Sequence, residues 1–381
     1  MMGVLMKITE IKTAEVSIKS GETTYNYKYI RVYTDEGIYG TGEASHIDRG
    51  WRESTRHMAK MIIGMDPRDV DSCFELIRRN YIFMGGAGGA AISALTGIEI
   101  ALWDLAGKAQ KIPVYGLLGG KFRDRIRLYV DSAHTAYDER AAEVKERGFT
   151  AIKFDLDDAK NPHKIDPWNW SVTPDELNSL LTQAFNIREG VGASLDLAID
   201  LHGRYDATAG MKLAQELEPL NLLWLEEPVP PENIDALSKI THATGTPICV
   251  GENLYLRHGF RDLLQQQAAD IIMPDISKCG GLSECRKIAN MAELYYVPFA
   301  PHNNSSALST VGDAHVCASV PNFLVLEYHR FDDPTWDDVL ATNTSVIKDG
   351  HVVLTDAPGL GVELNEEFLQ TYSTDEGPLW Q

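Results

Sequence analysis

Three acidic residues recur along the chain at an equal interval: Asp200, Glu226 and Glu252, each 26 positions after the one before. Each follows a short apolar run. A strand, a loop, a helix and a return loop take roughly 25 to 30 residues, so this spacing is typical of a repeated β/α unit. The strands of such a repeat all end at one face, where the three carboxylates would converge. Like charges so placed need a counter-charge, and a hard divalent cation with oxygen ligands, most simply Mg²⁺, would supply it.

Other polar side chains follow further apolar runs that we expect to be strands. Alternate residues of a strand share a face, so two residues separated by one position would point together into the mouth of a barrel. Lys153 with Asp155 and Asp200 with His202 form such pairs. The remaining strand ends supply Asp275, His302 and Glu327. Glu227, which directly follows Glu226, would point the other way, and we expect a structural role for it.

The elements that must position these residues are eight strands. They are expected at residues 127–130, 151–154, 195–199, 222–225, 247–250, 271–273, 297–300 and 324–326. The step from the second to the third is long because a Trp- and Pro-rich loop is inserted at residues 161–174. We therefore predict an α/β fold, a modified (β/α) TIM-type barrel with an α+β N-terminal capping domain that the C-terminal tail completes. The expected division is 1–125 for the cap, 126–335 for the barrel and 336–381 for the tail.

The first 125 residues change character twice. Residues up to about 45 alternate as an antiparallel sheet does, with a hairpin at 29–40 and a polar, aromatic loop at 20–27. Helical periodicity runs from 51 to about 79, and an apolar helix is expected at 92–109. The glycine-rich stretch before that helix has neither a preceding strand nor a following Gly-Lys-Ser. We expect a close approach between domains there rather than a phosphate-binding loop.

Composition narrows the class of protein. The 381 residues include 35 Lys and Arg against 55 Asp and Glu, a formal net charge of −20. Such an acidic surface excludes nucleic acid as the expected partner. Five scattered cysteines without a C-x-x-C pair are typical of a reducing compartment. The first ten residues lack the features of a signal peptide, and no run approaches 18 apolar residues, so we expect a cytoplasmic protein without a membrane span.

Several motifs occur in order and at strand spacing. They are W-L-E-E-P at 224–228, G-E-N at 251–253, P-H-N at 301–303, A-L-W-D-L-A-G-K at 101–108 and P-G-L-G-V-E at 358–363. Together they resemble the enolase superfamily, in its mandelate racemase subgroup, over nearly the whole chain. Sites of that superfamily pair a Lys or His base with Mg²⁺ that stabilises an enediolate intermediate.

The resemblance implies a role for each strand-end residue. Asp200, Glu226 and Glu252 would be the Mg²⁺ ligands, and the cation would grip a substrate carboxylate. His302 would be the catalytic base, with Asp275 as the partner that fixes its tautomer. Glu327, in its protonated form, would donate a hydrogen bond to the substrate carboxylate, and Lys153 would help to neutralise that carboxylate.

Two residues separate branches of the subgroup. Mandelate racemase has a second lysine, the base on the opposite face of the substrate, where this chain has Asp155. This departure argues against racemisation, which needs a base on each face of the substrate, and favours a one-base reaction. The D-x-H formed by Asp200 and His202 resembles the galactonate dehydratase branch, where the histidine protonates the departing 3-hydroxyl. A role of His202 in orienting its neighbours by hydrogen bonding is the alternative.

The resemblance therefore implies a hydro-lyase, a Mg²⁺-dependent dehydratase that converts an aldonate such as gluconate, galactonate or xylonate to a 2-keto-3-deoxy acid. A racemase or epimerase of a 2-hydroxy acid is the first alternative; a non-catalytic member of the fold is the second, and diacid sugars stay open as substrates. The reaction product distinguishes a dehydratase from a racemase or epimerase, and a missing metal ligand would mark a non-catalytic member of the fold. Residues 20–27 and 46–51 would close over the barrel mouth. A small sugar acid is the expected partner, and a homo-oligomer between dimer and octamer the expected assembly.

Overall fold

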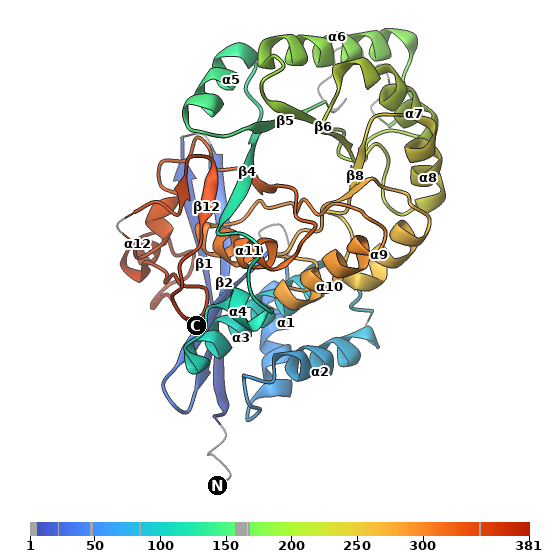
Figure 1. The fold of residues 1–381 in the computed structure, drawn as a ribbon. Helices are drawn as coiled ribbons and strands as arrows, with labels where there is room; N and C mark the ends of the chain where they lie inside the picture. Colours follow the sequence, from blue (N-terminus) through green and yellow to red (C-terminus); the bar gives the residue numbers. More distant parts are fainter. Residues whose placement is uncertain are drawn as a thin grey trace.

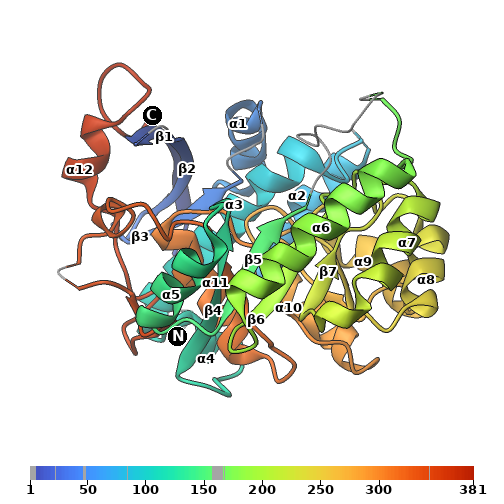
Figure 2. The same ribbon diagram turned by 90° about the horizontal axis from the view of Figure 1, so that it is seen from above.

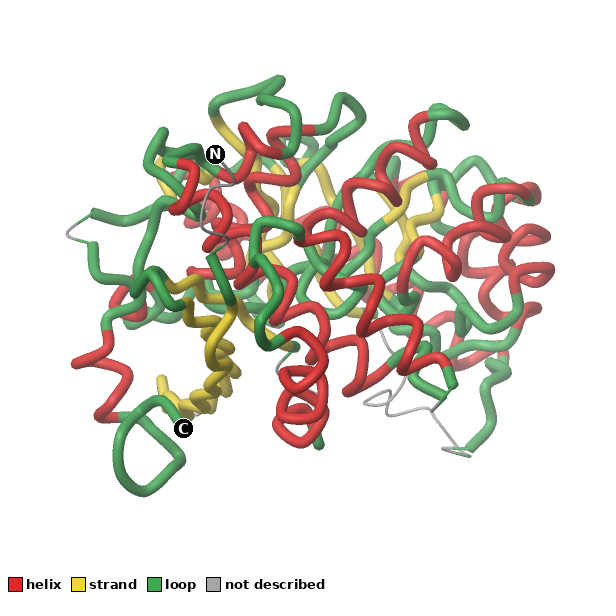
Figure 3. The backbone as a smooth tube through the Cα atoms, turned by 90° about the horizontal axis from the view of Figure 1, so that it is seen from below, coloured by secondary structure: helices red, strands yellow, loops and turns green. Residues whose placement is uncertain are grey.

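The computed structural model describes residues 6–21, 23–45, 49–83, 85–156, 166, 168–342 and 344–381. In these ranges the chain forms a barrel of short strands surrounded by helices, with a sheet-and-helix cap against it (Figure 1). Figure 3 shows the barrel strands lying inside the helices. The α/β barrel fold with a capping domain is therefore confirmed. The boundaries expected at residues 125 and 335 stay a prediction.

The barrel strands pair in the order in which they occur in the sequence. They are β4 (Arg125–Ser132), β5 (Ala151–Asp155), β6 (Asp196–Asp200), β7 (Trp224–Glu226), β8 (Ile248–Val250), β9 (Ile271–Ile272) and β10 (Leu326–Tyr328). Neighbours from β4 to β9 are parallel, and β10 pairs with β4. The seventh strand expected at 297–300 is reduced to a bridge at Phe299, which pairs with Ile272 and Phe323. Pro298 and Pro301 flank that bridge and cannot donate to a ladder, which explains its shortness.

Helices follow the strands and cover the outside of the barrel (Figure 1). They are α5 (Tyr137–Glu146), α6 (Pro174–Val191), α7 (Ala207–Glu216), α8 (Ile234–Ala243), α9 (Leu256–Gln265), α10 (Leu282–Glu293) and α11 (Ala307–Ser319), whereas α4 (Val114–Leu117) precedes β4. Local sequence sets where they begin. Thr173 and Glu176 form a capping box at the start of α6, with Pro174 at its first position. Of the long inserted loop, residues 157–165 and 167 lie outside the described residues, and Trp168 and Trp170 are exposed.

The cap combines a sheet with three helices. Its elements are β1 (Ile8–Ser20), β2 (Thr23–Thr34), β3 (Tyr39–Ala44), α1 (Trp51–Ile62), α2 (Val70–Ile82) and α3 (Gly89–Gln110). The loop expected at 20–27 is wrong: β1 and β2 pair up to Ser20 and Thr23. The Thr and Tyr residues of that stretch favour a strand, and Gly21, at a φ of +60°, supplies the turn. Residues 46–48 of the other expected closing segment lie outside the described residues.

Close backbone contacts join the cap helix α3 to its neighbours. A Cβ at Gly40 or Gly42 of β3 would lie 2.1 or 2.2 Å from a carbonyl oxygen of α3, so only glycine fits there. Gly88, in the glycine-rich stretch, lies against the ring of Tyr255 in the barrel. By length and composition α3 is the one candidate membrane span in the described part of the chain, yet 78% of its most apolar window is buried in the protein. We identify it as a core helix.

The C-terminal segment links barrel and cap. It contains a short 3-10 helix at Asp337–Val339, β11 (Ile347–Lys348), β12 (His351–Val353) and α12 (Glu366–Thr371). β12 pairs antiparallel with β4, and α12 lies beside β1 in Figures 1 and 2. Asp104 of α3 accepts a hydrogen bond from the Leu360 amide at 2.9 Å, and Lys108 lies 2.6 Å from Glu363. Two of the motifs that carried the resemblance are thus in direct contact.

The barrel interior is filled in layers. One apolar layer points inward from successive strands and consists of Tyr129, Ala151, Ala198, Trp224, Cys249, Ile271, Met273, Ala300 and Val325. Tyr129 and Trp224 meet edge to face, with ring centroids 5.2 Å apart. Since alternate residues of a strand share a face, the next inward layer lies two positions further along each strand. That layer holds Asp131, Lys153, Asp200 and Glu226.

Candidate active site

A buried lysine lies at the centre of this polar layer. Nζ of Lys153 lies 3.0 Å from Oδ2 of Asp200, 3.0 Å from Oε1 of Glu226 and 2.7 Å from Oε1 of Glu327. Each of these side chains is at most 2% exposed. One ammonium therefore faces three carboxylates in a site from which water is largely excluded, and the cluster carries excess negative charge.

The charge imbalance is visible in the ionisation of two of these groups. Burial opposes ionisation of Asp200, but Lys153 and His202 lower its pKa to about 2. Burial raises the pKa of Glu226 well above its ordinary value, and the charge of Asp200 raises it further. The one lysine thus does not fully compensate the pair, which is the situation that a bound cation relieves.

The third predicted metal ligand lies further along the site. Glu252 follows β8, and its Oε2 lies 3.1 Å from Nε2 of His302. Its other oxygen accepts a hydrogen bond from Asn253 at 3.0 Å. Its charge nevertheless contributes to the raised pKa of Glu226. The structure thus brings Asp200 and Glu226 together around Lys153 and places Glu252 beside His302.

His302 and Asp275 form a hydrogen-bonded pair. Nδ1 of His302 lies 2.9 Å from Oδ2 of Asp275, and the Ser277 hydroxyl donates to the other oxygen at 2.6 Å. Burial works against the charged imidazole, but Glu327, Glu252 and Asp275 raise the pKa of His302 above its ordinary value. An imidazole held in this way has a fixed orientation and increased basicity, as proton abstraction requires.

His202 and Asp155 lie on the other side of Asp200. His202 has a φ of +50°, its amide donates to Oδ1 of Asp200 at 2.8 Å, and its Nε2 is 3.5 Å from Oδ2. Asp155 is the register partner of Asp200 on β5. Burial, with the nearby charge of Asp131, raises the pKa of Asp155 to about 6. Ligand atoms of Asp155, Asp200 and His202 lie within 4.8 Å of one another, as those of His302, Glu327 and His329 also do.

The resemblance implies a protonated Glu327, and the charges around this carboxyl act in the opposite direction. Burial favours its neutral form, but Lys153, His302 and His329 hold the pKa of Glu327 well below its ordinary value. Its Oε2 accepts a hydrogen bond from the Asn303 amide at 3.0 Å. The cations around Glu327 therefore favour its anionic form over the protonated form that could donate a hydrogen bond.

Sequence reasoning missed one pair of residues. His329 follows β10, and its Nδ1 lies 3.1 Å from Oδ2 of Asp131 on β4. The signal was present in the sequence, because His329 follows Glu327 by two positions as His202 follows Asp200, and Asp131 directly follows the expected strand 127–130. Glu227 has a different role: its carboxylate accepts from Asn253 Nδ2 at 2.7 Å and from the Gly251 amide at 3.4 Å. It joins the ends of β7 and β8.

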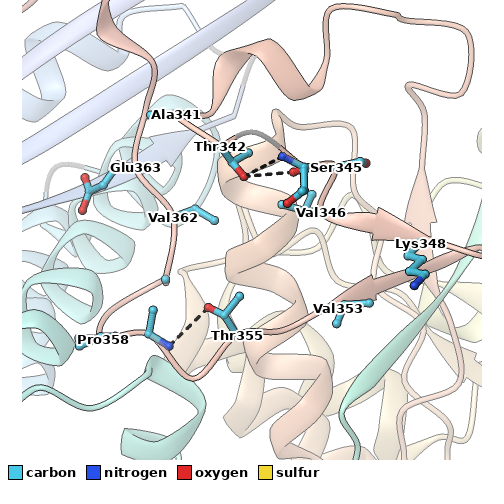
Figure 4. Close-up of a pocket in the computed structure, with 13 residues that line it drawn as sticks. Ala341, Thr342, Ser345, Val346, Lys348, Val353, Thr355, Pro358, Val362 and Glu363 are labelled. Atoms are coloured by element: carbon cyan, nitrogen blue, oxygen red, sulfur yellow. Dashed lines mark hydrogen bonds between the residues drawn. The ribbon is translucent and has the colours of Figure 1, made fainter.

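Six of the predicted site residues line a cavity of about 200 Å³: Lys153, Asp200, His202, Glu252, Asp275 and His302. Besides predicted site residues it is bordered by Ser45 of the cap and by Asn253, Lys278, Asn304 and His329. A larger hollow of about 610 Å³ lies within the C-terminal segment (Figure 4). Lys348 and Glu363 are the charged members of its described lining. The smaller cavity, with its concentration of acids, bases and cations, is the candidate active site.

Two family models match successive parts of the chain. The family model for the N-terminal domain of mandelate racemase / muconate lactonizing enzyme matches residues 4–119, and the enolase C-terminal domain-like model matches residues 136–368. A D-xylonate dehydratase of Haloferax volcanii is 39% identical over 376 residues, which is 97% of this chain and 89% of the relative. A D-galactonate dehydratase of Pectobacterium atrosepticum is 32% identical over 387 residues, 99% of this chain and 98% of the relative.

A solved structure agrees over the whole length. A mandelate racemase/muconate lactonizing enzyme-like protein from Rubrobacter xylanophilus superposes with a TM-score of 0.92 at 43% sequence identity. The match covers 99% of this chain and 100% of that structure. Cap, barrel and tail are therefore shared together.

Proposed function

The chain belongs to the mandelate racemase / muconate lactonizing enzyme family of the enolase superfamily, and on that premise we propose that it is an acid-sugar dehydratase, a hydro-lyase that removes water from an aldonate. The observation that carries the proposal is the placement of His302 with Asp275 and of His202 around one cavity. Dehydration needs a base for C2 and an acid for the 3-hydroxyl. The similarity to D-xylonate and D-galactonate dehydratases supports the same reaction class.

His302 takes the proton from C2 in this mechanism. The electrons of the C2–H bond move toward the carboxylate and give an enediolate. As they return, a double bond forms between C2 and C3 and the C3–O bond breaks. His202 gives a proton to the departing hydroxyl, which leaves as water. The resulting enol tautomerises to the 2-keto-3-deoxy acid.

We propose that Mg²⁺ is held by Asp200, Glu226 and Glu252, of which the first two contact Lys153 and the third lies beside His302. The pKa of Glu226, raised first by burial and then by the charge of Asp200, supports this proposal, because a bound cation would favour the ionised carboxylate. An all-oxygen set suits Mg²⁺, whereas the two groups that contain histidine would suit softer metals. When bound, Mg²⁺ would offset the second negative charge that develops on the substrate carboxylate. Lys153 would neutralise that carboxylate from β5.

Asp155 supports a one-base reaction. By the resemblance, Asp155 takes the position of the second lysine of mandelate racemase, and an anion is a poor second base beside a dianionic intermediate. Inversion at C2, which needs a base on each face, is therefore disfavoured. Epimerisation of a 2-hydroxy acid stays an alternative outcome, which identification of the product separates from dehydration.

The direct test is a screen of the purified protein with Mg²⁺ against mono- and diacid sugars. Formation of 2-keto-3-deoxy acids would be followed by semicarbazide absorbance. We expect a keto product from one or two aldonates, D-xylonate and D-galactonate being the first to try. Solvent deuterium entering C2 with no keto product would make the protein an epimerase. If no acid gives a keto product or takes up deuterium at C2, the proposed activity is contradicted.

We also propose a cytoplasmic setting and a homo-oligomer between dimer and octamer. All five cysteines are buried free thiols, which suits a reducing compartment. Phe83 and Tyr296 expose 94% and 95% of their surface, an exposure that subunit contacts would reduce. Light scattering on the purified protein would give the number of subunits, and a monomer would contradict the proposed assembly.

A further inference from the structure

His329 is a polar residue of the cavity that the proposed mechanism does not use. It lies at the end of β10, lines the same cavity as His302 and His202, and its ring centroid is 5.9 Å from that of His302. Its Nδ1 is 3.1 Å from Oδ2 of Asp131. Asp131 thus lies against one ring nitrogen of His329, as Asp275 lies against one of His302, and the other nitrogen, Nε2, lies beside Glu327 at the wall of the cavity.

The other ring nitrogen has no well-aligned acceptor. Nε2 of His329 is buried and lies 3.2 Å from Oε1 of Glu327, but no group in the described part of the chain accepts a hydrogen bond of good geometry from it. Nε2 and Glu327 therefore form a short ion pair, as Nδ1 does with Asp131. A buried donor costs free energy unless a partner satisfies it. In a cavity built for a small polar molecule, that partner is the substrate.

The charges around His329 keep its ring protonated. Asp131 on β4 and Glu327 on β10 face it directly, His302 adjoins it, and Lys153 on β5 lies 3.8 Å from Asp131 and 2.7 Å from Glu327. Burial opposes the charged form, but Asp131 and Glu327 raise the pKa of His329 to about 10. With Nδ1–H directed to Asp131, the protonated ring also carries a hydrogen on Nε2.

The hydrogen on Nε2 of His329 can serve as the hydrogen-bond donor to the substrate carboxylate, the role that the resemblance gives to Glu327. A substrate carboxylate that gains a second negative charge needs a hydrogen-bond donor beside it. Lys153 and the two histidines lower the pKa of Glu327 and so favour its anionic form. Its neighbour His329 carries the hydrogen that this form lacks, 3.2 Å away on the same strand end.

We propose that His329, oriented by Asp131, is a further catalytic residue that donates a hydrogen bond from Nε2 to the substrate carboxylate and stabilises the enediolate formed from it. The assignment deepens the proposed function and rests on it. His329 makes or breaks no covalent bond in this role. The ligand that it recognises is the carboxylate end of a sugar acid.

The test compares His329→Asn with wild type on D-xylonate and D-galactonate, using His258→Asn, a change at an exposed histidine of α9, as the matched control. We expect the kcat of dehydration to fall about 10²- to 10³-fold, as on removal of one oxyanion donor, and exchange of the C2 hydrogen with solvent deuterium to fall with it. Mg²⁺ affinity, measured by calorimetry without substrate, should stay unchanged. The control should behave as wild type.

Two results would overturn the assignment. One is a kcat within about threefold of wild type; the other is loss of Mg²⁺ binding, which would make His329 a metal ligand together with His302 and Glu327. A wild-type protein that neither dehydrates nor exchanges any sugar acid would instead remove the proposed function itself. The two failures are therefore distinguishable.

Asp131→Asn provides a second route if His329→Asn does not fold. Asparagine keeps the size of the side chain but removes the charge that favours the protonated ring. The imidazolium is lost as pH rises, so the alkaline limb of the kcat profile should move to lower pH in the variant. An alkaline limb at the wild-type position would contradict the role of His329.

Discussion

Nδ1 of His302 lies 2.9 Å from Oδ2 of Asp275. This contact leaves the other ring nitrogen, Nε2, to accept the proton from the substrate. Nε2 lies 3.1 Å from Glu252 and 3.6 Å from Glu327. The base is thus oriented by one carboxylate and held in a strongly negative field by two more. Such a field favours an imidazole that accepts a proton and keeps it during the reaction.

Replacing Asp275 by asparagine should lower activity without removing the base. The amide keeps the size of the side chain but can present its NH₂ group to Nδ1 and favour the wrong tautomer. We expect kcat to fall about 10²- to 10⁴-fold, the range of general-base catalysis, while Mg²⁺ affinity stays near wild type. Steady-state kinetics and calorimetry would measure the two. A variant with wild-type kcat would contradict the orienting role of Asp275.

Isotope exchange should distinguish the roles of the two histidines in the proposed mechanism. His302→Asn should stop both dehydration and entry of solvent deuterium at C2, because the base is gone. His202→Asn should stop dehydration and leave exchange, because the C2 proton can still be removed. Mass spectrometry of recovered substrate would follow exchange. Full dehydration by His202→Asn would make His202 an orienting residue, the alternative that the sequence left open.

The carboxylates of the proposed metal site should be required together for binding Mg²⁺. Glu226→Gln removes a charge beside Asp200 without changing the size of the side chain. Mg²⁺ binding and turnover should both be lost, whereas chelation and resupply of Mg²⁺ should inactivate and restore the wild type. Glu227→Gln is the matched control, since Glu227 joins the ends of β7 and β8 through Gly251 and Asn253. Turnover by Glu226→Gln without added metal would remove the metal proposal.

The sequence predicted the barrel and most residues of its mouth because both depend on local pattern. Apolar runs at regular spacing define parallel strands, and the polar residue after each run is placed by the strand itself. Asp200, Glu226 and Lys153 were found in this way and lie in one inward layer. His329 and Asp131 follow the same rule, but the resemblance assigned no role to them and drew attention to other positions.

What could not be predicted depends on contacts between distant segments. The β1–β2 hairpin extends through residues that look like a loop, because pairing from Ser20 with Thr23 to Ile18 with Tyr25 outweighs their polarity. The lowered pKa of Glu327 follows from Lys153, His302 and His329, which come from three different strand ends. Neither result can be derived from composition or spacing, because both are properties of tertiary neighbours.

The link between barrel and C-terminal segment should make stability sensitive to acid. His315 on α11 accepts a hydrogen bond from the Tyr115 amide at Nδ1 and contacts the Leu360 carbonyl through Nε2, at 3.1 and 3.0 Å. It is therefore neutral in the folded protein, and burial lowers its pKa to about 4. The unfolded chain, with a histidine pKa of about 6.5, binds a proton first as pH falls. Between these values the folded state loses roughly 3 kcal/mol of stability from this group alone.

Urea unfolding of wild type and His315→Gln at pH 7 and at pH 4.5 would isolate that contribution. Glutamine offers a carbonyl and an NH₂ group to the same two partners but does not titrate. We expect the variant to be less stable than wild type at pH 7, because the ring packs against Tyr115 with a centroid distance of 5.6 Å. The difference should shrink as pH falls, since only wild type must keep a buried imidazole unprotonated. An equal loss of stability in both proteins on acidification would show that His315 does not couple the C-terminal segment to pH.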